Sequence, residues 1–363
     1  MDGINPKRIT FARERRGLTI TELAERCGVS QQALSFWESG RRSLSEDVAR
    51  QLAASLSFPI EFFHGGDIER LPPGAASFRA RTKLSARNRA SALAAGTMAA
   101  SLARWIEERF QLPKVDLPEL HGQRPDLAAE VVRQQWLLGY KPIPNMIHLL
   151  ESRGVFVFSL AQDCRDIDAF SFWMGSRPIV MLNTIKSAER STLDAAHELA
   201  HLVLHSEETG KKEEQEANAF AGHFLIPESD LRRQVPAFTS MEQLLEVKKR
   251  WGVSLAALIY RMHGVGILSE WQYRRLYIEI SKNDWTKSEP RPMKRQGSAL
   301  LAKVFADLRA RRITPRAIAR DLSWSVDDLN ELIFGLGASW TTVDGAGDST
   351  GQKRPDLRLV DKR

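Results

Sequence analysis

Hydrophobic residues recur at helical spacing along most of the chain, and short apolar runs replace that pattern in one region. Most helical segments are bounded by Ser, Thr, Gly or Pro. Residues 154–159, 170–173 and 177–183 are instead short, apolar and rich in β-prone residues. A Met-Gly-Ser turn separates the last two, which predicts a hairpin. The pattern therefore predicts a mainly α protein with one small β-sheet.

The first 66 residues predict a group of short helices. Helices are predicted over residues 6–16, 20–26, 31–38 and 46–56. Thr19 and Glu22 match a capping box at the start of the second helix, and Ser30 is placed to cap the third. Apolar residues on both sides of the intervening turn are spaced to pack these two helices together: Leu23, Ala24, Val29, Leu34 and Trp37. This segment predicts a helix-turn-helix.

A His-Glu-x-x-His pattern lies inside a later helical segment, at residues 197–201. At helical spacing His197 and His201 lie one turn apart on one face, where two imidazoles can bind a single zinc ion. Glu198 between them would then point toward a water on the metal. A zinc site of this type needs a third protein ligand and an open position for water.

The third ligand is predicted on the helix that follows. A polar turn ending at Gly210 makes the two helices antiparallel. With a rise of about 1.5 Å per residue, His201 lies roughly 6 Å before the end of the first helix and Glu216 roughly 7.5 Å into the second. Glu216 is therefore predicted to be level with the histidines. Glu213 is the alternative ligand, although it lies nearer the turn and is expected to be more solvated.

These segments resemble the ImmA/IrrE family of zinc metallopeptidases. The resemblance rests on residues 190–193, 202–205 and 216–227, and it runs from about residue 125 to about residue 270. It implies a zincin-like α+β domain in which His197, His201 and Glu216 bind the metal. It also implies that Glu198 is the general base, which activates a zinc-bound water for peptide-bond hydrolysis.

The roles of two other histidines near this pattern are left open. His205 lies one turn beyond His201, where it either supports the site or forms part of a plain helix surface. His223 departs from the family pattern and leaves open an extra polar group near the site. In peptidases of this kind an edge strand beside the metal helix can bind an extended substrate, and residues 170–173 or 178–182 could do so here.

The N-terminal helices resemble the Xre/Cro-like repressor family. In that family the second helix of the motif enters the major groove of DNA with its first residues facing the bases. The resemblance implies base contacts by Gln31, Gln32 and Ser35, Gln being suited to adenine. Ile20 and Phe36 depart from the family, which has polar or basic residues at these positions.

Charge supports a nucleic-acid partner only in part. The 363-residue chain has a formal net charge of +7, which favours a polyanion. Residues 1–66 contribute little, because nine Lys or Arg face eight Asp or Glu. Residues 78–89 carry five cations and no acid, and this segment either follows the DNA backbone or begins a solvated helix.

Cysteine usage and hydropathy predict a compartment. Two cysteines, Cys27 and Cys164, do not make a disulfide scaffold and suit a reducing cytoplasm. No apolar run approaches the roughly 18 residues of a membrane span. We therefore expect a cytoplasmic protein without a membrane partner.

Pro- and Gly-containing segments divide the chain. The predicted units are a helix-turn-helix domain (1–66), a helical linker (67–124), a metallopeptidase domain (125–270), a C-terminal helical region (271–340) and a disordered tail (341–363). Within the C-terminal region, helices over 314–322 and 325–334 resemble a second helix-turn-helix loosely, and packing against a partner is the alternative role.

Together the two resemblances imply a DNA-associated zinc-dependent endopeptidase that cleaves a partner transcriptional repressor of the Xre type. The same ligands would also accept manganese or iron. One alternative is a transcription regulator whose peptidase-like domain is a sensor. The other is a toxin-antitoxin or phage-defence component that acts by binding a partner, and a homodimer is left open.

Overall fold

The computed structural model describes residues 3–72, 74, 77–80, 84–160, 164, 166–206, 210–235 and 240–337. It is mainly helical with one small sheet, which confirms the predicted fold class. The predicted tail, residues 341–363, lies outside the described residues. In the described part of the chain, no helix is long and apolar enough to cross a membrane.

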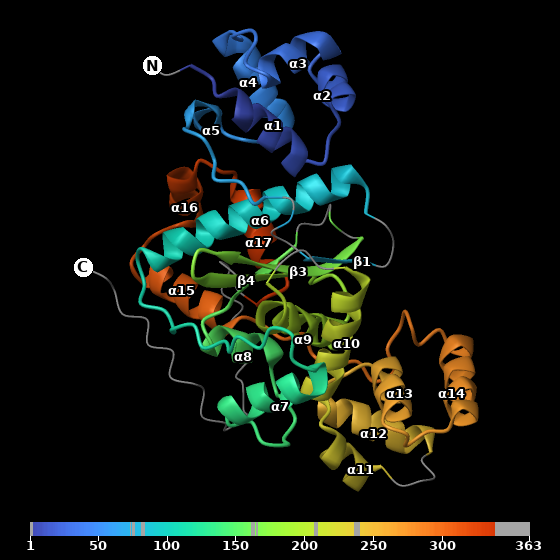
Figure 1. Cartoon of the computed structure of the whole chain (residues 1–363). Coiled ribbons are helices and arrows are strands. Elements are labelled where there is room, and N and C mark those ends of the chain that lie inside the picture. Colours follow the sequence, from blue (N-terminus) through green and yellow to red (C-terminus); the bar gives the residue numbers. More distant parts are fainter. Residues whose placement is uncertain are drawn as a thin grey trace.

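The N-terminal domain consists of five short helices at one end of the molecule (Figure 1). They are α1 (Pro6–Arg15), α2 (Ile20–Arg26), α3 (Gln31–Glu38), α4 (Glu46–Leu56) and α5 (Ile60–His64). The capping box of Thr19 and Glu22 is present, and the Ser30 hydroxyl accepts a hydrogen bond from the Ala33 N–H at 3.1 Å. Between α2 and α3 the chain turns at Gly28, whose φ of +62° is easily adopted only by glycine. The predicted helix-turn-helix is confirmed.

Four strands form the sheet: β1 (Ser77–Ala80), β2 (Phe156–Ser159), β3 (Ile167–Met174) and β4 (Arg177–Leu182). Their order is β1-β3-β4-β2, with β3 antiparallel to both β1 and β4, and β2 parallel to β4. The predicted hairpin is β3–β4. The prediction that residues 170–173 or 178–182 form an edge strand was wrong, because β1, which overlaps the basic segment 78–89, pairs with the outer side of β3.

Helices cover both faces of the sheet (Figure 1). The long helix α6 (Ala86–Glu107) lies on one face, and α8 (Met146–Ser152) and α9 (Ala188–Leu204) lie on the other. Gly96 allows the close approach of α6, because a Cβ there would lie 3.1 Å from a ring carbon of Phe170. Apolar side chains of β3 and β4 therefore form a core that holds α9 in place.

A second group of helices packs beside α9. It contains α7 (Pro125–Gln135), α10 (Lys211–Leu225), α11 (Glu228–Gln234), α12 (Met241–Trp251), α13 (Leu255–Gly264) and α14 (Glu270–Lys282). Helix α10 packs on both α9 and α7, through buried residues such as Phe220 and Phe224. The antiparallel pair α9–α10, which the polar turn predicts, is the part of this group that builds the candidate site.

The C-terminal helices are α15 (Ala299–Ala310), α16 (Pro315–Leu322) and α17 (Val326–Ile333). The turn between α16 and α17 has the geometry of the turn between α2 and α3. Ser323 has a φ of +56°, the Trp324 N–H donates to the Ala319 carbonyl, and the Ser325 hydroxyl accepts from the Asp328 N–H. The pair is therefore a helix-turn-helix in local geometry. It also packs within the molecule, against β2. Packing against a partner, the other role left open by the sequence, stays a prediction.

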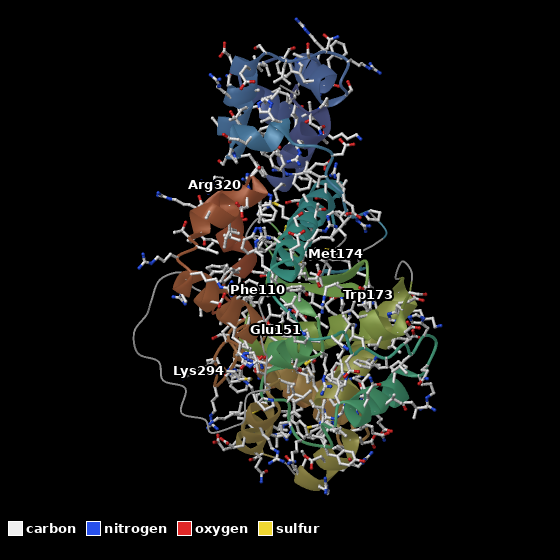
Figure 2. The ribbon with its side chains drawn as sticks, turned by 90° about the vertical axis from the view of Figure 1, so that its left-hand side faces the viewer. Phe110, Glu151, Trp173, Met174, Lys294 and Arg320 are labelled. Atoms are coloured by element: carbon white, nitrogen blue, oxygen red, sulfur yellow. The ribbon has the colours of Figure 1, made fainter. Side chains whose placement is uncertain are left out.

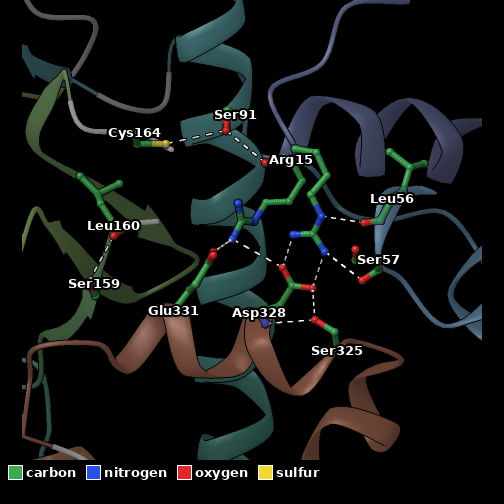
Figure 3. Close-up of polar contacts among 11 residues, drawn as sticks. Arg15, Leu56, Ser57, Ser91, Ser159, Leu160, Cys164, Ser325, Asp328 and Glu331 are labelled. Atoms are coloured by element: carbon green, nitrogen blue, oxygen red, sulfur yellow. Dashed lines mark hydrogen bonds and ion pairs between the residues drawn. The ribbon is translucent and has the colours of Figure 1, made fainter. Parts of the chain in front are cut away.

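Arg15, the last residue of α1, and Arg16, its C-cap, join the N-terminal domain to α17 (Figure 3). Arg16 makes a two-pronged contact with the Asp328 carboxylate, with Nη2 and Oδ2 2.8 Å apart. Arg15 is fully buried and forms ion pairs with Asp328 and Glu331. Such planar guanidinium–carboxylate pairs fix orientation as well as distance, so the helix-turn-helix domain is docked in a defined position.

Candidate metal centre

Helix α9 carries the His-Glu-x-x-His pattern into the interior. Ser187 caps the helix, and its hydroxyl accepts from the Arg190 N–H. The side chains of His197 and Glu198 are completely buried, and His201 is nearly so. These groups lie between the sheet on one side of α9 and helix α10 on the other.

Three side chains bring ligand atoms together at this position: His197, His201 and Glu214. The two Nε2 atoms lie 3.0 Å apart, and each lies 3.3 Å from an oxygen of the Glu214 carboxylate. Tetrahedral zinc with ligands at about 2.0–2.1 Å separates its donor atoms by about 3.3 Å. No second group of three His, Cys, Asp or Glu side chains meets this closely in the described part of the chain. The donor set and its spacing therefore fit a zinc ion.

The third residue is not the one that we predicted, because Glu216 does not lie beside the two histidines. Its carboxylate faces His205, and Glu214 takes the predicted place. Along a helix of 3.6 residues per turn, positions 214 and 216 are about 200° apart around the axis. Glu214 and Glu216 differ little in height along the helix axis. The direction in which each side chain points around that axis therefore decides which carboxylate faces the histidines. The alternative, Glu213, accepts a hydrogen bond from the Gly210 N–H at 2.9 Å and caps α10.

Glu216 instead completes a hydrogen-bonded chain behind the site. His201 Nδ1 lies 3.0 Å from His205 Nδ1, and His205 Nε2 lies 3.2 Å from the Glu216 carboxylate. With Nε2 of His201 turned to the cluster, its Nδ1–H donates to His205, which in turn donates to Glu216. Such chains fix the tautomer and ring orientation of a metal-ligating histidine. Of the two roles left open for His205, the contacts match support of the site.

Electrostatics at the cluster favours an ionised carboxylate. Burial alone would raise the pKa of Glu214, but hydrogen bonds and charge interactions with His197 and His201 hold that pKa well below its ordinary value. Burial lowers the pKa of His205, and its contact with Glu216 only partly opposes this. An ionised carboxylate is the form in which Glu214 can bind a cation.

Glu198 is held by the sheet. The Ser171 hydroxyl, from the middle of β3, donates to Glu198 Oε2 at 2.8 Å. Ser171 is itself almost fully buried, so this contact is shielded from water. The sequence pattern places Glu198 beside the histidines, but Ser171 could not be found from the sequence because it lies 27 residues earlier in a strand.

His223 does not join the cluster. It lies near the other end of α10 from Glu214, in a cavity of about 280 Å³ that is also lined by Arg133 and Glu228. Arg261 contacts its ring, with Arg261 Nη2 and His223 Nδ1 2.9 Å apart. Burial and the adjacent guanidinium lower the pKa of His223 to about 4. The extra polar group therefore belongs to the packing of α10 against α13.

The predicted DNA-contacting residues share one exposed surface. Gln31, Gln32 and Ser35 are all exposed at the N-terminal end and outer side of α3. Residues 81–83 of the predicted basic segment lie outside the described residues, and the segment continues into α6. There the guanidinium of Arg87 pairs with Glu22 at 2.9 Å.

Two family models match the chain. Residues 150–263 match the peptidase M78 family, described as the IrrE N-terminal-like domain, and residues 10–63 match a helix-turn-helix family. No curated protein matches this chain. The two matches confirm both resemblances seen in the sequence. The protein is a DNA-binding regulator of the helix-turn-helix type that carries a peptidase-family domain.

Proposed function

We propose that this protein is a DNA-associated zinc endopeptidase that cleaves a partner repressor of the Xre type. The observation that carries the proposal is the convergence of His197, His201 and Glu214 next to the buried carboxylate of Glu198. Two imidazoles, one carboxylate and an adjacent acid/base group are the parts of a hydrolytic zinc site. The helix-turn-helix domain would bring this site to a repressor on neighbouring DNA.

Each residue of the site has a separate role in the proposed reaction. Zinc, when bound, polarises the scissile carbonyl and the attacking water. Glu198 takes a proton from that water on its carboxylate and delivers it to the leaving amine. Ser171 keeps the carboxylate in place, and the chain from His201 through His205 to Glu216 fixes one ligand ring. Because the site is buried, each of these interactions is stronger than it would be in water.

The first test is the Glu198→Gln variant. We expect cleavage of a co-expressed partner repressor of the Xre type to fall by about 10²–10⁴-fold, because an amide cannot accept the proton. Zinc content should stay at the wild-type level, because Glu198 is not a ligand. Glu119→Gln, which changes an exposed carboxylate, is the matched control and should cleave normally. Undiminished cleavage by Glu198→Gln would refute the mechanism.

The DNA-reading role of α3 is tested with Gln31→Ala and Gln32→Ala. Each lost base contact should cost about 1–3 kcal/mol of binding to the specific operator. Affinity for unrelated DNA should change little, since these side chains are not cationic. Arg41→Ala, which removes an exposed cation just after α3, should weaken binding to both DNAs alike. Fluorescence anisotropy at fixed salt measures all three, and unchanged operator affinity in both Gln variants would exclude base reading by α3.

A further inference from the structure

Strand β3 runs beside the candidate general base. Its Ser171 hydroxyl contacts the Glu198 carboxylate, and the strand packs against α9 along the buried face of the sheet. One side of β3 is hydrogen-bonded to β4. The other side of β3 faces the edge of the sheet that is nearest Glu198. The opposite edge is formed by β2, which lies two strands away from β3.

That nearest edge is occupied by β1. Strand β1 pairs antiparallel with β3, and Ser77 lies opposite Ser171. Among the described residues the pairing runs from Ala80 to Ser77, and Phe172–Met174 are paired with β4. Trp173 in this part of β3 is 43% exposed, and Figure 2 labels it together with Met174 at the end of β3.

Strand β1 comes from the segment that joins the two functional parts of the chain. It follows the helix-turn-helix domain and precedes α6. The chain just before it is held on α6, where the Leu71 N–H donates to the Thr97 hydroxyl at 3.1 Å. The contact of β1 with the sheet is short, at four residues, and its register shifts between Arg79 and Ala80. A short strand with a bulge makes few ladder hydrogen bonds, which makes it displaceable.

An extended peptide binds a sheet by adding a strand to an exposed edge. With β1 in place, a peptide added to this sheet lies one strand spacing, about 4.8 Å, farther from Glu198. We propose that β1 is an intramolecular competitor of the substrate, which must leave β3 before a partner protein can bind there. This inference rests on the proposed peptidase function and adds a regulatory step, since the competing strand belongs to the connection with the DNA-binding domain.

The test uses the full-length chain carrying Glu198→Gln and a fluorescent peptide that reproduces residues 74–83. In one variant Phe78 and Arg79 are both replaced by Pro. Neighbouring N–H groups of an antiparallel strand point alternately toward and away from the partner, so one of the two prolines removes a ladder hydrogen bond. The tether gives β1 an effective concentration in the millimolar range, so β1 competes strongly with a free peptide for β3. We therefore expect the peptide to bind the proline variant at least about tenfold more tightly than the unbroken chain, which carries Glu198→Gln without the prolines.

Two controls make the result specific. The same peptide with the two prolines should bind neither protein. In a second variant, Arg79→Cys with Ala169→Cys places cysteines at directly opposite positions. Its disulfide should hold β1 on β3 and abolish peptide binding, and reduction should restore it to the level of the unbroken chain. Retained operator binding and a cooperative melting transition of the α-helical signal show that each variant is folded.

Equal binding of the peptide by the unbroken and proline-containing chains would overturn the proposal, as would peptide binding by the oxidised cysteine pair. Neither measurement depends on cleavage. A protein without zinc or without peptidase activity would therefore refute the proposed function and leave the competition by β1 standing. Absence of competition would leave the peptidase proposal intact.

Discussion

The Glu214→Gln variant should bind zinc more than about 100-fold more weakly than the wild type. Replacing a residue that only supports a metal ligand typically costs about 10–100-fold in affinity, and Glu214 is a candidate ligand itself. In the wild type, Glu214 Oε2 lies 3.3 Å from His197 Nε2 and Glu214 Oε1 lies 3.3 Å from His201 Nε2. Gln keeps the shape of the side chain but removes its negative charge. Glu214 is the one carboxylate among the three candidate ligands, so this charge is the anionic part of the ligand set. Metal analysis of the purified protein and titration against a chromophoric chelator measure the effect.

The Glu216→Gln variant should behave differently. Glu216 ends the chain through His205 and does not reach the cluster, so its loss should weaken zinc binding by about 10–100-fold while stoichiometric zinc remains at saturating metal. Glu213→Gln changes a neighbouring carboxylate that caps α10 and should leave zinc affinity unchanged. Full metal loss in Glu216→Gln together with normal zinc binding in Glu214→Gln would restore the ligand set predicted from the sequence.

Local signals in the sequence were sufficient for the helix-turn-helix domain. The ends of α2, α3 and α4 agree with the predicted ends because each begins at a Ser or Thr cap and ends at a turn or before a new cap. The pair of histidines in α9 was equally accessible, because a spacing of four within one helix fixes their relation. In both cases the information lies within about ten residues.

The third ligand and the edge strand depend on contacts between distant segments. The choice of Glu214 over Glu216 depends on how α10 is rotated against α9, which spacing within either helix does not reveal. Strand β1 has a polar, basic sequence and becomes a strand because β3 offers it an edge. Tertiary context of this kind commonly decides short strands.

Two further local signals in the sequence mark helix ends in the second half of the chain. Arg26-Cys27-Gly28-Val29-Ser30 and Arg250-Trp251-Gly252-Val253-Ser254 differ at one position, and both form the turn of a helix pair with glycine at positive φ. In the second pair the residue matching Gln31 is Leu255, which is buried. This copy of the turn therefore serves packing, with its helix turned into the peptidase domain. The capping box of Ser269 and Gln272 likewise marks the start of α14, a helix within the predicted C-terminal helical region whose own bounds were not predicted.

The Asp328→Asn variant should lose about 3–5 kcal/mol of folding free energy, the usual cost of removing one partner from a buried ion pair. Arg15 is fully buried and Arg16 mostly so, and both contact this carboxylate. Glu331 would still face Arg15, but Arg16 would keep no carboxylate among its contacts in the described residues, which are then two backbone carbonyls and the ring of Phe58. Thermal unfolding measures the loss, and limited proteolysis between residues 64 and 85 should show a loosened N-terminal domain. Asp327→Asn, its exposed neighbour, is the matched control.

The same variant should show a characteristic dependence on pH. Burial would raise the pKa of Asp328, but Arg16 and Arg15 hold this pKa below its ordinary value. A carboxyl whose pKa is lower in the folded than in the unfolded protein stabilises the fold above its unfolded pKa, and this contribution is lost as pH falls toward the folded value. The difference in melting temperature between wild type and Asp328→Asn should therefore be largest near pH 7 and shrink in acid below about pH 4. A difference that is constant from pH 7 to pH 3 would show that the ion pair between the two domains does not contribute to stability, and the docking of α1 on α17 would then have to depend on apolar contacts.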